Sequence, residues 1–441
     1  MNYDGSPFEL DRELARAHEA WRAWRRRLEL NPQLEDTPLE RFRPHTSRRT
    51  FLNLGRLPED DPLRDPLRRW VYRLGEERVN QAALTEVARS RYGEQHPLSG
   101  PKAGDFSLSE MLERALTERG KRAPWLAAFT QHAAPTSNQM VTLWQRRGEF
   151  ARRLGFESPL AMEASVDDAA GLAQGLATRL RERVAEAELG SPQGWLDAAL
   201  GEDVRATWPA RLNGQRLLDF FRDGSLFRGL ELGPRRLPSA VGAASFLLGF
   251  ARLGGAWFDA QTPTDQPFCI ARDPYRLDEH VASYLFALLP LNPAFLARKL
   301  DVGRDALVDI RRRLAQIWAL ELSAAALRVR LRAAAFDSES RLRETYEELA
   351  ELDLGLRLPR SLAGVFFRLR SEDEQRLLGL LLAAERAAQL TEAHDEDWFR
   401  NPRAIEQLRA EAKLPPRKRV TREVAESAAA VTMRGIEAAW K

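Results

Sequence analysis

The sequence predicts an all-α protein built from many long helices, with little or no β structure. Ala, Leu, Arg and Glu are abundant and β-branched residues are scarce, which is the composition that long helices favour. Apolar residues recur at spacings of three and four, and long alternating patterns typical of strands are missing. With 441 residues, 44% of them apolar, the chain can bury a large core.

The first helix is expected to begin at a capping box. Ser6 and Glu9 have the required spacing, and Pro7 occupies the first helical position. One apolar stripe then follows, made of Leu10, Leu14, Ala17, Trp21, Trp24 and Leu28. Residues 31–64 are rich in Pro, Asp and Arg and indicate an extended connection.

The remaining helices are expected between Gly and Pro breaks. In the first half they cover 66–90, a segment opened by a second capping box at Ser107, 138–154 ending at Gly155, a segment after Ser165, and 213–227. In the second half they cover 240–258, 274–289, 292–300, 304–335, 338–352, 372–391, 402–412 and 422–440. We divide the chain into an N-terminal helical region (1–135), a larger helical domain (136–414) and a basic linker with a terminal helix (415–441).

Charge and cysteine content limit which cellular location and which classes of partner are expected. The net charge is only +3, with 67 basic and 64 acidic residues, and this mixture argues against nucleic acid as the partner. Arg greatly outnumbers Lys, a bias associated with a GC-rich, bacterial genome. The single cysteine, Cys269, excludes an internal disulfide, and no signal peptide is recognisable at the N-terminus. We therefore expect a cytoplasmic protein.

The segment 240–258 is the one place where a membrane span has to be weighed. It is apolar over about the 20 residues that a bilayer requires. Arg252 and several glycines interrupt it, however, so we interpret it as a buried core helix that packs closely on its neighbours. No membrane span is expected.

Familiar catalytic and metal-binding motifs do not occur. The six histidines are too far apart to place two ligands on one helical face, and the pair His18 and Glu19 is followed by Arg22 where HExxH requires a second His. Phosphate-binding glycine loops and a GxSxG nucleophile elbow are also missing. We therefore expect no metal and no cofactor.

One charged cluster stands in apolar surroundings. Asp278, Glu279 and His280 lie at the start of a predicted helix, and Tyr284 follows one turn later. These four residues are our candidates for lining a cleft. The competing interpretation, which we favour at this point, is a helix start followed by a core helix. The basic run 417–419 lies in a Pro-rich connector and is a candidate contact for an acidic partner.

Three segments together resemble the helical zinc metallopeptidases of the thimet oligopeptidase, angiotensin-converting enzyme and M32 carboxypeptidase type. The run 146–156, RRGEFARRLGF, resembles their segment before a long helix. The run 217–232, LLDFFRDGSLFRGLEL, resembles the approach to their zinc helix, and 377–390, LLGLLLAAERAAQL, resembles their C-terminal helix. The resemblance implies a large zincin-related helical fold over residues 140–415.

The same resemblance implies that the zinc site has been lost. In that family a HExxH helix supplies two His ligands and the catalytic Glu, but 240–258 contains neither His nor Glu. Glu279 is the counterpart of the family's downstream acidic ligand, and one carboxylate cannot hold a catalytic zinc. The family's substrate-binding tyrosines have no match, since 372–392 contains no Tyr. The chain is then a pseudoenzyme on a degenerate peptidase fold.

Three hypotheses about function follow. The first is a non-catalytic protein that binds a peptide or protein, or acts as a scaffold, on this fold. The second is a peptidase-like hydrolase with a non-standard site near Glu279 and His280, supported by Asp278, Tyr284 or Tyr346. The third is a homo-oligomer or other assembly that packs through its first and terminal helices.

Overall fold

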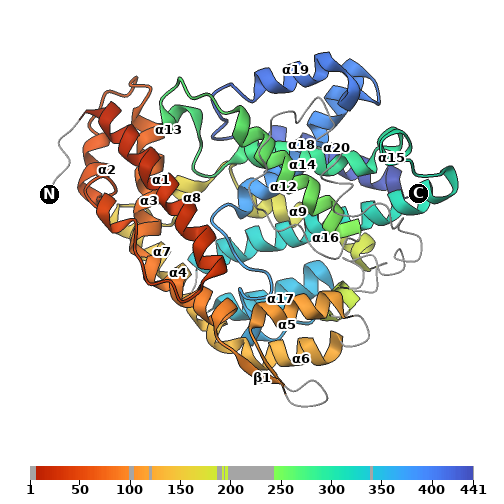
Figure 1. Cartoon of the computed structure of the whole chain (residues 1–441), viewed down its shortest axis with the longest axis horizontal. Helices are drawn as coiled ribbons and strands as arrows, with labels where there is room; N and C mark the ends of the chain where they lie inside the picture. Colours follow the sequence, from red (N-terminus) through yellow and green to blue (C-terminus); the bar gives the residue numbers. More distant parts are fainter. Residues whose placement is uncertain are drawn as a thin grey trace.

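The protein is all-α, as the sequence predicts, apart from one small hairpin (Figure 1). The computed structural model describes residues 6–98, 104–118, 122–185, 191–192, 194–196, 243–337 and 341–440. Within these residues, the strands are β1 (His96–Leu98) and β2 (Gly104–Phe106), which pair antiparallel with His96 opposite Phe106. The helix expected over 213–227 lies outside the described residues.

The first part of the chain contributes nine described helices and two short turns. The helices are α1 (Pro7–Leu30), α2 (Arg48–Leu54), α3 (Arg64–Val79), α4 (Gln81–Ala88), α5 (Leu108–Thr117), α6 (Arg122–His132), α7 (Ala134–Arg153), α8 (Leu160–Glu163) and α9 (Ala169–Ala185). The turns are η1 (Glu40–Phe42) and η2 (Arg89–Gly93). Both expected capping boxes form, at Ser6 with Glu9 and at Ser107 with Glu110. Gly155 has φ of +92°, so its expected role as the left-handed residue after a helix is also confirmed.

Two expectations for this part were wrong. Residues 31–64 are not an extended connection, because they contain η1 and α2, and the Ser47 side chain caps α2 by accepting from the Thr50 amide. The single helix expected over 66–90 is divided into α3 and α4 at Asn80. The Asn80 side-chain amide donates to the Glu76 carbonyl at 2.9 Å, and such local bonds compete with helix continuation.

The second part contributes nine described helices, among them α16, the longest described helix, with 34 residues. They are α12 (Ala243–Gln261), α13 (Phe268–Ala271), α14 (Leu277–Leu288), α15 (Pro293–Arg298), α16 (Arg304–Asp337), α17 (Leu342–Leu354), α18 (Asp373–His394), α19 (Pro402–Glu411) and α20 (Arg422–Trp440), with the turns η5 (Leu289–Leu291), η7 (Arg360–Leu362) and η8 (Trp398–Arg400). The long helix expected over 304–335 is confirmed by α16, and the terminal helix is confirmed by α20.

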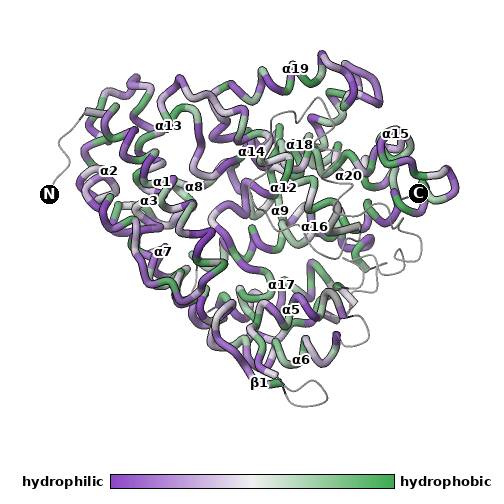
Figure 2. The backbone as a smooth tube through the Cα atoms, in the orientation of Figure 1, coloured by the Kyte–Doolittle hydropathy of each residue, from purple (hydrophilic) through white to green (hydrophobic). Residues whose placement is uncertain are grey.

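The largest core lies where α9, α12, α14, α16, α18 and α20 meet. Helix α14 packs on both α12 and α18, while α16 contacts α9, α18 and α20 (Figure 1). A second core joins α5, α6 and α7 to α16 and α17, and a third fastens α1, α2 and α3 to Cys269 of α13. Figure 2 shows hydrophobic residues concentrated around α12 and α18, whereas hydrophilic residues recur along the outer helices.

Helix α12 covers most of the segment weighed as a membrane span. Its residues Leu247, Phe250, Leu253 and Trp257 are buried in the largest core. A Cβ atom added to Gly254 would lie 2.6 Å from the ring of Phe286, so glycine permits α14 to approach closely. No helix within the described part of the chain combines the length and apolar character that crossing a membrane requires.

Candidate functional site

The four candidate residues lie on one helix, but their side chains have different environments. All belong to α14, which is preceded by Arg276 in a left-handed conformation with φ of +63°. Asp278 accepts two hydrogen bonds from Arg417 of the basic linker, one from its backbone N–H and one from its Nε, each at 2.6 Å. Asp278 therefore anchors the linker.

Glu279 is already engaged in an ion pair. Its carboxylate accepts from Nε of Arg276 at 2.6 Å and contacts a second guanidinium nitrogen of the same residue. A Cβ atom added to Gly255 of α12 would lie 3.3 Å from Glu279 Oε1, so α12 passes directly beside the carboxylate. Among the residues that the structure describes, no group of three or more His, Cys, Asp or Glu side chains is placed to hold a metal ion.

His280 is buried at the contact between α14 and α18. Only 5% of its surface is exposed, and a Cβ atom added to Gly379 would lie 2.6 Å from His280 Cβ. The Nε2 atom has no hydrogen-bond partner. Burial, and then the charges of Arg376 and Arg276, lower the pKa of His280 well below its usual value. The imidazole is consequently neutral at physiological pH.

Tyr284 follows His280 by one helical turn and is half-buried. Its ring meets that of Trp318 on α16 edge to face, with 6.0 Å between the centroids. Burial raises the pKa of its hydroxyl. Tyr284 does not itself line a pocket, but its neighbour Trp318 does.

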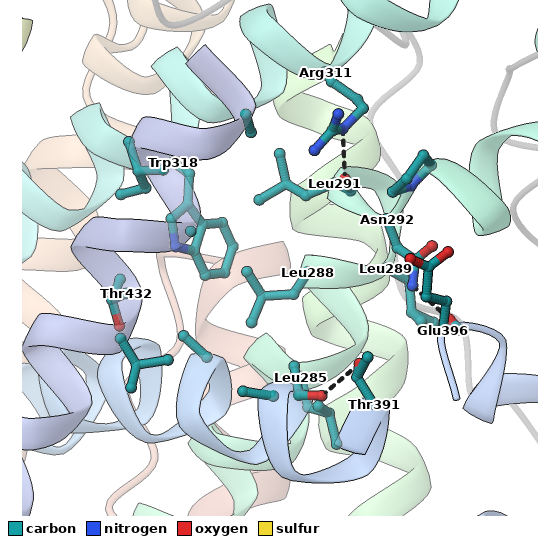
Figure 3. A pocket seen from close by; sticks show the side chains of 18 of the residues that line it. Leu285, Leu288, Leu289, Leu291, Asn292, Arg311, Trp318, Thr391, Glu396 and Thr432 are labelled. Atoms are coloured by element: carbon teal, nitrogen blue, oxygen red, sulfur yellow. Dashed lines mark hydrogen bonds between the residues drawn. The ribbon is translucent and has the colours of Figure 1, made fainter. Parts of the chain in front are cut away.

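The pocket is an apolar cavity of about 320 Å³ between the C-terminal parts of α14, α18 and α20 and the N-terminal half of α16 (Figure 3). Its volume falls at the lower end of the range for small-ligand sites. Figure 3 shows the indole of Trp318 and the side chains of Leu288 and Leu291 directed toward one space. The other apolar lining residues are Leu285, Leu289, Pro293, Ala384, Ala387, Ala388, Trp398, Val431, Gly435, Ile436 and Ala439.

Polar groups occur mainly at the edge of this pocket. Arg311 is half-buried and its Nε donates to the Leu291 carbonyl at 3.0 Å, which holds the guanidinium in place. The side-chain amide of Asn292 donates to the Glu396 carbonyl at 2.7 Å, while the Glu396 residue itself is exposed. The pocket therefore combines an apolar interior with an edge that carries charges of both signs.

Gly435 on α20 lies in a wall of this pocket and has free space beside it. A Cβ atom added at that position would have no heavy atom within 4 Å, so a larger side chain can be placed there without a collision. The residue is exposed at the edge of the cavity. Gly175 on α9 has the same free space but lies outside the pocket. The two glycines form a matched pair for mutagenesis.

The basic linker makes its contacts with other segments of the same chain. Besides the contacts of Arg417, the guanidinium of Arg419 contacts Asp167 at 2.6 Å, and the backbone N–H of Val420 donates to the Ser165 carbonyl at 2.8 Å. Lys418 is exposed, and partial desolvation by its neighbours, followed by the charge of Arg69, lowers its pKa. The run 417–419 thus connects the start of α14 to the segment before α9.

A buried ionic network that sequence reasoning missed lies between α3, α7 and the start of α18. The guanidinium of Arg73 contacts Glu76 at 3.3 Å and Glu77 at 3.0 Å, and Arg147 contacts both carboxylates at 3.5 Å. Arg73 also reaches Glu372 at 3.5 Å. Each of these side chains is almost fully removed from solvent, and such charges persist in an interior only when they are paired.

Comparison with known proteins does not assign this chain to a family. No protein-family model matches the chain, and no curated protein sequence matches it either. Of the three segments behind the resemblance to zinc peptidases, 146–156 lies in α7 and its following turn and 377–390 lies within α18. The segment 217–232 lies outside the described residues. The resemblance therefore remains a hypothesis.

Proposed function

We propose that this protein is a non-catalytic binding or scaffold protein that holds a peptide or protein segment. The observation that carries the proposal is the apolar pocket between α14, α16, α18 and α20, with Arg311 and Glu396 at its edge. An apolar side chain of the partner fits such an interior, and polar groups of the partner's backbone fit the edge. We further propose that this function resides on a degenerate zinc-peptidase-like fold.

The state of the charged candidates supports binding over hydrolysis. A general base must be free to take a proton and must lie within hydrogen-bond reach of the reacting group. Glu279 is held by Arg276, and the neutral His280 is buried with its Nε2 facing no partner. A hydrolase centred on these two residues would first have to break the ion pair, so we rank that hypothesis second.

We place the protein in a reducing cytoplasm. Cys269 is buried, with 3% of its surface exposed, and burial raises the pKa of its thiol. Its backbone N–H donates to Asp11 at 2.8 Å, which ties α13 to α1. A thiol of this kind packs as a small apolar group. It serves neither as a reactive nucleophile nor as a partner for a disulfide.

The pocket is tested by filling it. We expect Gly435→Phe to abolish the capture of peptides from a synthetic library in which each member carries one Leu, Phe or Trp anchor. Gly175→Phe places the same side chain on another helix and is the matched control. Equal capture by both variants and the wild-type protein would rule out the pocket as the binding site.

Absence of catalysis is tested separately on the wild-type protein. Metal content is measured by plasma mass spectrometry, together with hydrolysis of a mixed fluorogenic peptide library. We expect neither stoichiometric zinc nor cleavage. Chelator-sensitive cleavage would contradict the non-catalytic proposal and favour the hydrolase hypothesis. Light scattering over a range of concentrations tests the assembly hypothesis, for which a rise in mass is the expected signature.

A further inference from the structure

Most polar side chains that line the apolar pocket are already bonded within the chain. The hydroxyls of Thr391 and Thr432 each donate to a backbone carbonyl one turn earlier in the same helix, at 2.9 and 2.8 Å. The Asn292 side chain accepts from two backbone N–H groups at the start of α15 and donates to the Glu396 carbonyl. These three side chains therefore have little hydrogen-bonding capacity left for a ligand.

Arg311 differs from them, because its two terminal nitrogens remain available. Its Nε donates to the Leu291 carbonyl at 3.0 Å, which fixes the orientation of the guanidinium. Nη1 and Nη2 make no hydrogen bond or ion pair with any residue that the structure describes. Figure 3 shows the guanidinium beside Leu291, next to the space toward which Leu288 and Trp318 are directed. An apolar interior thus adjoins a fixed pair of charged donors.

Glu396 is the other charged residue at the edge, and it does not neutralise Arg311. No ion pair joins the two side chains in the described part of the chain. Glu396 is exposed, so an ion pair between its solvated carboxylate and a ligand's amine would contribute little. Arg311 is half-buried and already held by its bond to Leu291, so less side-chain freedom is lost when it binds an anion. The edge therefore favours an anionic group of the ligand over a cationic one.

We propose that the pocket binds the C-terminal residue of its partner, with an apolar side chain in the cavity and the terminal carboxylate on Arg311. This inference rests on the binding function proposed above. A chain terminus carries an apolar side chain and a carboxylate on the same residue, which matches an apolar cavity with a guanidinium at its edge. Nη1 and Nη2 form an end-on pair of donors that suits the two oxygens of a carboxylate. A residue within a chain presents a neutral amide there and leaves the guanidinium without an anion.

The test compares peptides that differ only at the C-terminus. Short N-acetylated peptides that end in Leu or Phe are titrated into the full chain by calorimetry, each as the free acid and as the C-terminal amide. A third form carries a Gly-Gly extension, which moves the carboxylate away from the apolar residue. We expect the free acid to bind about tenfold or more tightly than the other two forms, which is the effect of hydrogen bonds between charged groups.

Variants of Arg311 test whether this residue carries the preference. Arg311→Gln should bind the acid and the amide equally, while its affinity for the amide stays that of the wild-type protein. Arg311→Lys keeps the charge but lacks the paired donors, so it should retain part of the preference. Arg313→Gln is the matched control, because Arg313 lies on α16 but bonds to Gln316 at 2.9 Å and does not line the pocket. A variant that folds poorly loses affinity for both peptides, which distinguishes it from one that loses only the preference.

The outcomes separate this inference from the binding function on which it rests. Equal affinity of the wild-type protein for acid and amide, with both lost in Gly435→Phe, would overturn the role of the terminal carboxylate and leave the pocket as a binding site. A preference for the acid that persists in Arg311→Gln would overturn it as well. If no peptide binds in any form, both proposals are wrong. Octanoate is titrated separately, and binding of octanoate without any peptide would assign the pocket to small apolar acids and contradict a chain terminus as the ligand.

Discussion

Glu76 offers the sharpest test of the buried ionic network. The residue is fully removed from solvent on α3, and its Oε1 lacks a hydrogen-bond partner. Burial raises the pKa of its carboxyl to about 7, although the neighbouring guanidinium of Arg147 opposes this and the carboxylate of Glu163 reinforces it. The substitution Glu76→Gln replaces this titrating group with a neutral one of nearly the same shape.

The expected effect on stability follows from the two pKa values. A change from the ordinary value of 4.5 to about 7 in the folded protein is equivalent to about 3 kcal/mol. Because the folded state holds the proton more tightly, the native protein binds more protons between these values, and its free energy of unfolding falls as pH rises through that window. Glu76→Gln should remove this decline, so the free energy of unfolding of the variant should rise relative to that of the wild-type protein as pH increases.

Glu77 is the matched control, since it shares the partners Arg73 and Arg147. Burial by itself raises the pKa of Glu77, but the charges of these two arginines outweigh it and lower the net value. Its ionised form therefore stabilises the fold at neutral pH, and that stabilisation is lost as pH falls through the folded pKa. Glu77→Gln should accordingly destabilise the protein by an amount that stays nearly constant from about pH 5 to about pH 8, whereas the difference for Glu76→Gln changes across this range.

The assay is urea unfolding followed by circular dichroism, from about pH 5 to about pH 8, for the wild-type protein and both variants. The quantity compared is the difference in free energy of unfolding between each variant and the wild type at each pH. If the difference for Glu76→Gln is independent of pH, the folded protein does not hold a proton on this residue. The argument from burial would then be wrong.

Two further predictions concern close packing and the other buried pair. Gly379→Ala should destabilise the protein by about 1–3 kcal/mol, since the added Cβ would lie 2.6 Å from His280 Cβ and 2.9 Å from its backbone carbonyl carbon; thermal denaturation measures this, and an unchanged melting temperature would show that α14 and α18 can separate freely. Glu163→Gln should cost about 3–5 kcal/mol, because it leaves the buried guanidinium of Arg332 without its counter-charge. A loss below about 1 kcal/mol in urea unfolding would contradict that pairing.

Local signals in the sequence were enough to predict much of the helical framework. The capping box at Ser6 and the apolar stripe after it define α1, because both depend only on residues within a few turns. The long α16 and the terminal α20 follow from the same periodicity. The break at Asn80 was missed because its cause is a single side-chain hydrogen bond that periodicity does not report.

The sites were less accessible because they depend on helix pairs that are distant in sequence. Helix α14 and its residues Asp278 to His280 were identified, yet their partners come from elsewhere: Arg417 lies 139 residues beyond Asp278. Arg73 and Glu372 are 299 residues apart, and the apolar pattern of the sequence offers no reason to pair two charges inside a core. The pocket walls come from four helices and the turns η5 and η8, so no single segment of the sequence contains a pattern that predicts the pocket.

The position of α20 in the pocket determines when the pocket can form during synthesis of the chain. One wall is formed by α20, through Val431, Thr432, Gly435, Ile436 and Ala439. The other walls come from α14, α16, α18 and the turns η5 and η8, all of which precede α20 in the chain. Translation proceeds from the N-terminus, so a nascent chain completes three walls before the fourth has left the ribosome. An incompletely synthesised protein therefore exposes an apolar trough, and only translation through residue 439 completes the pocket.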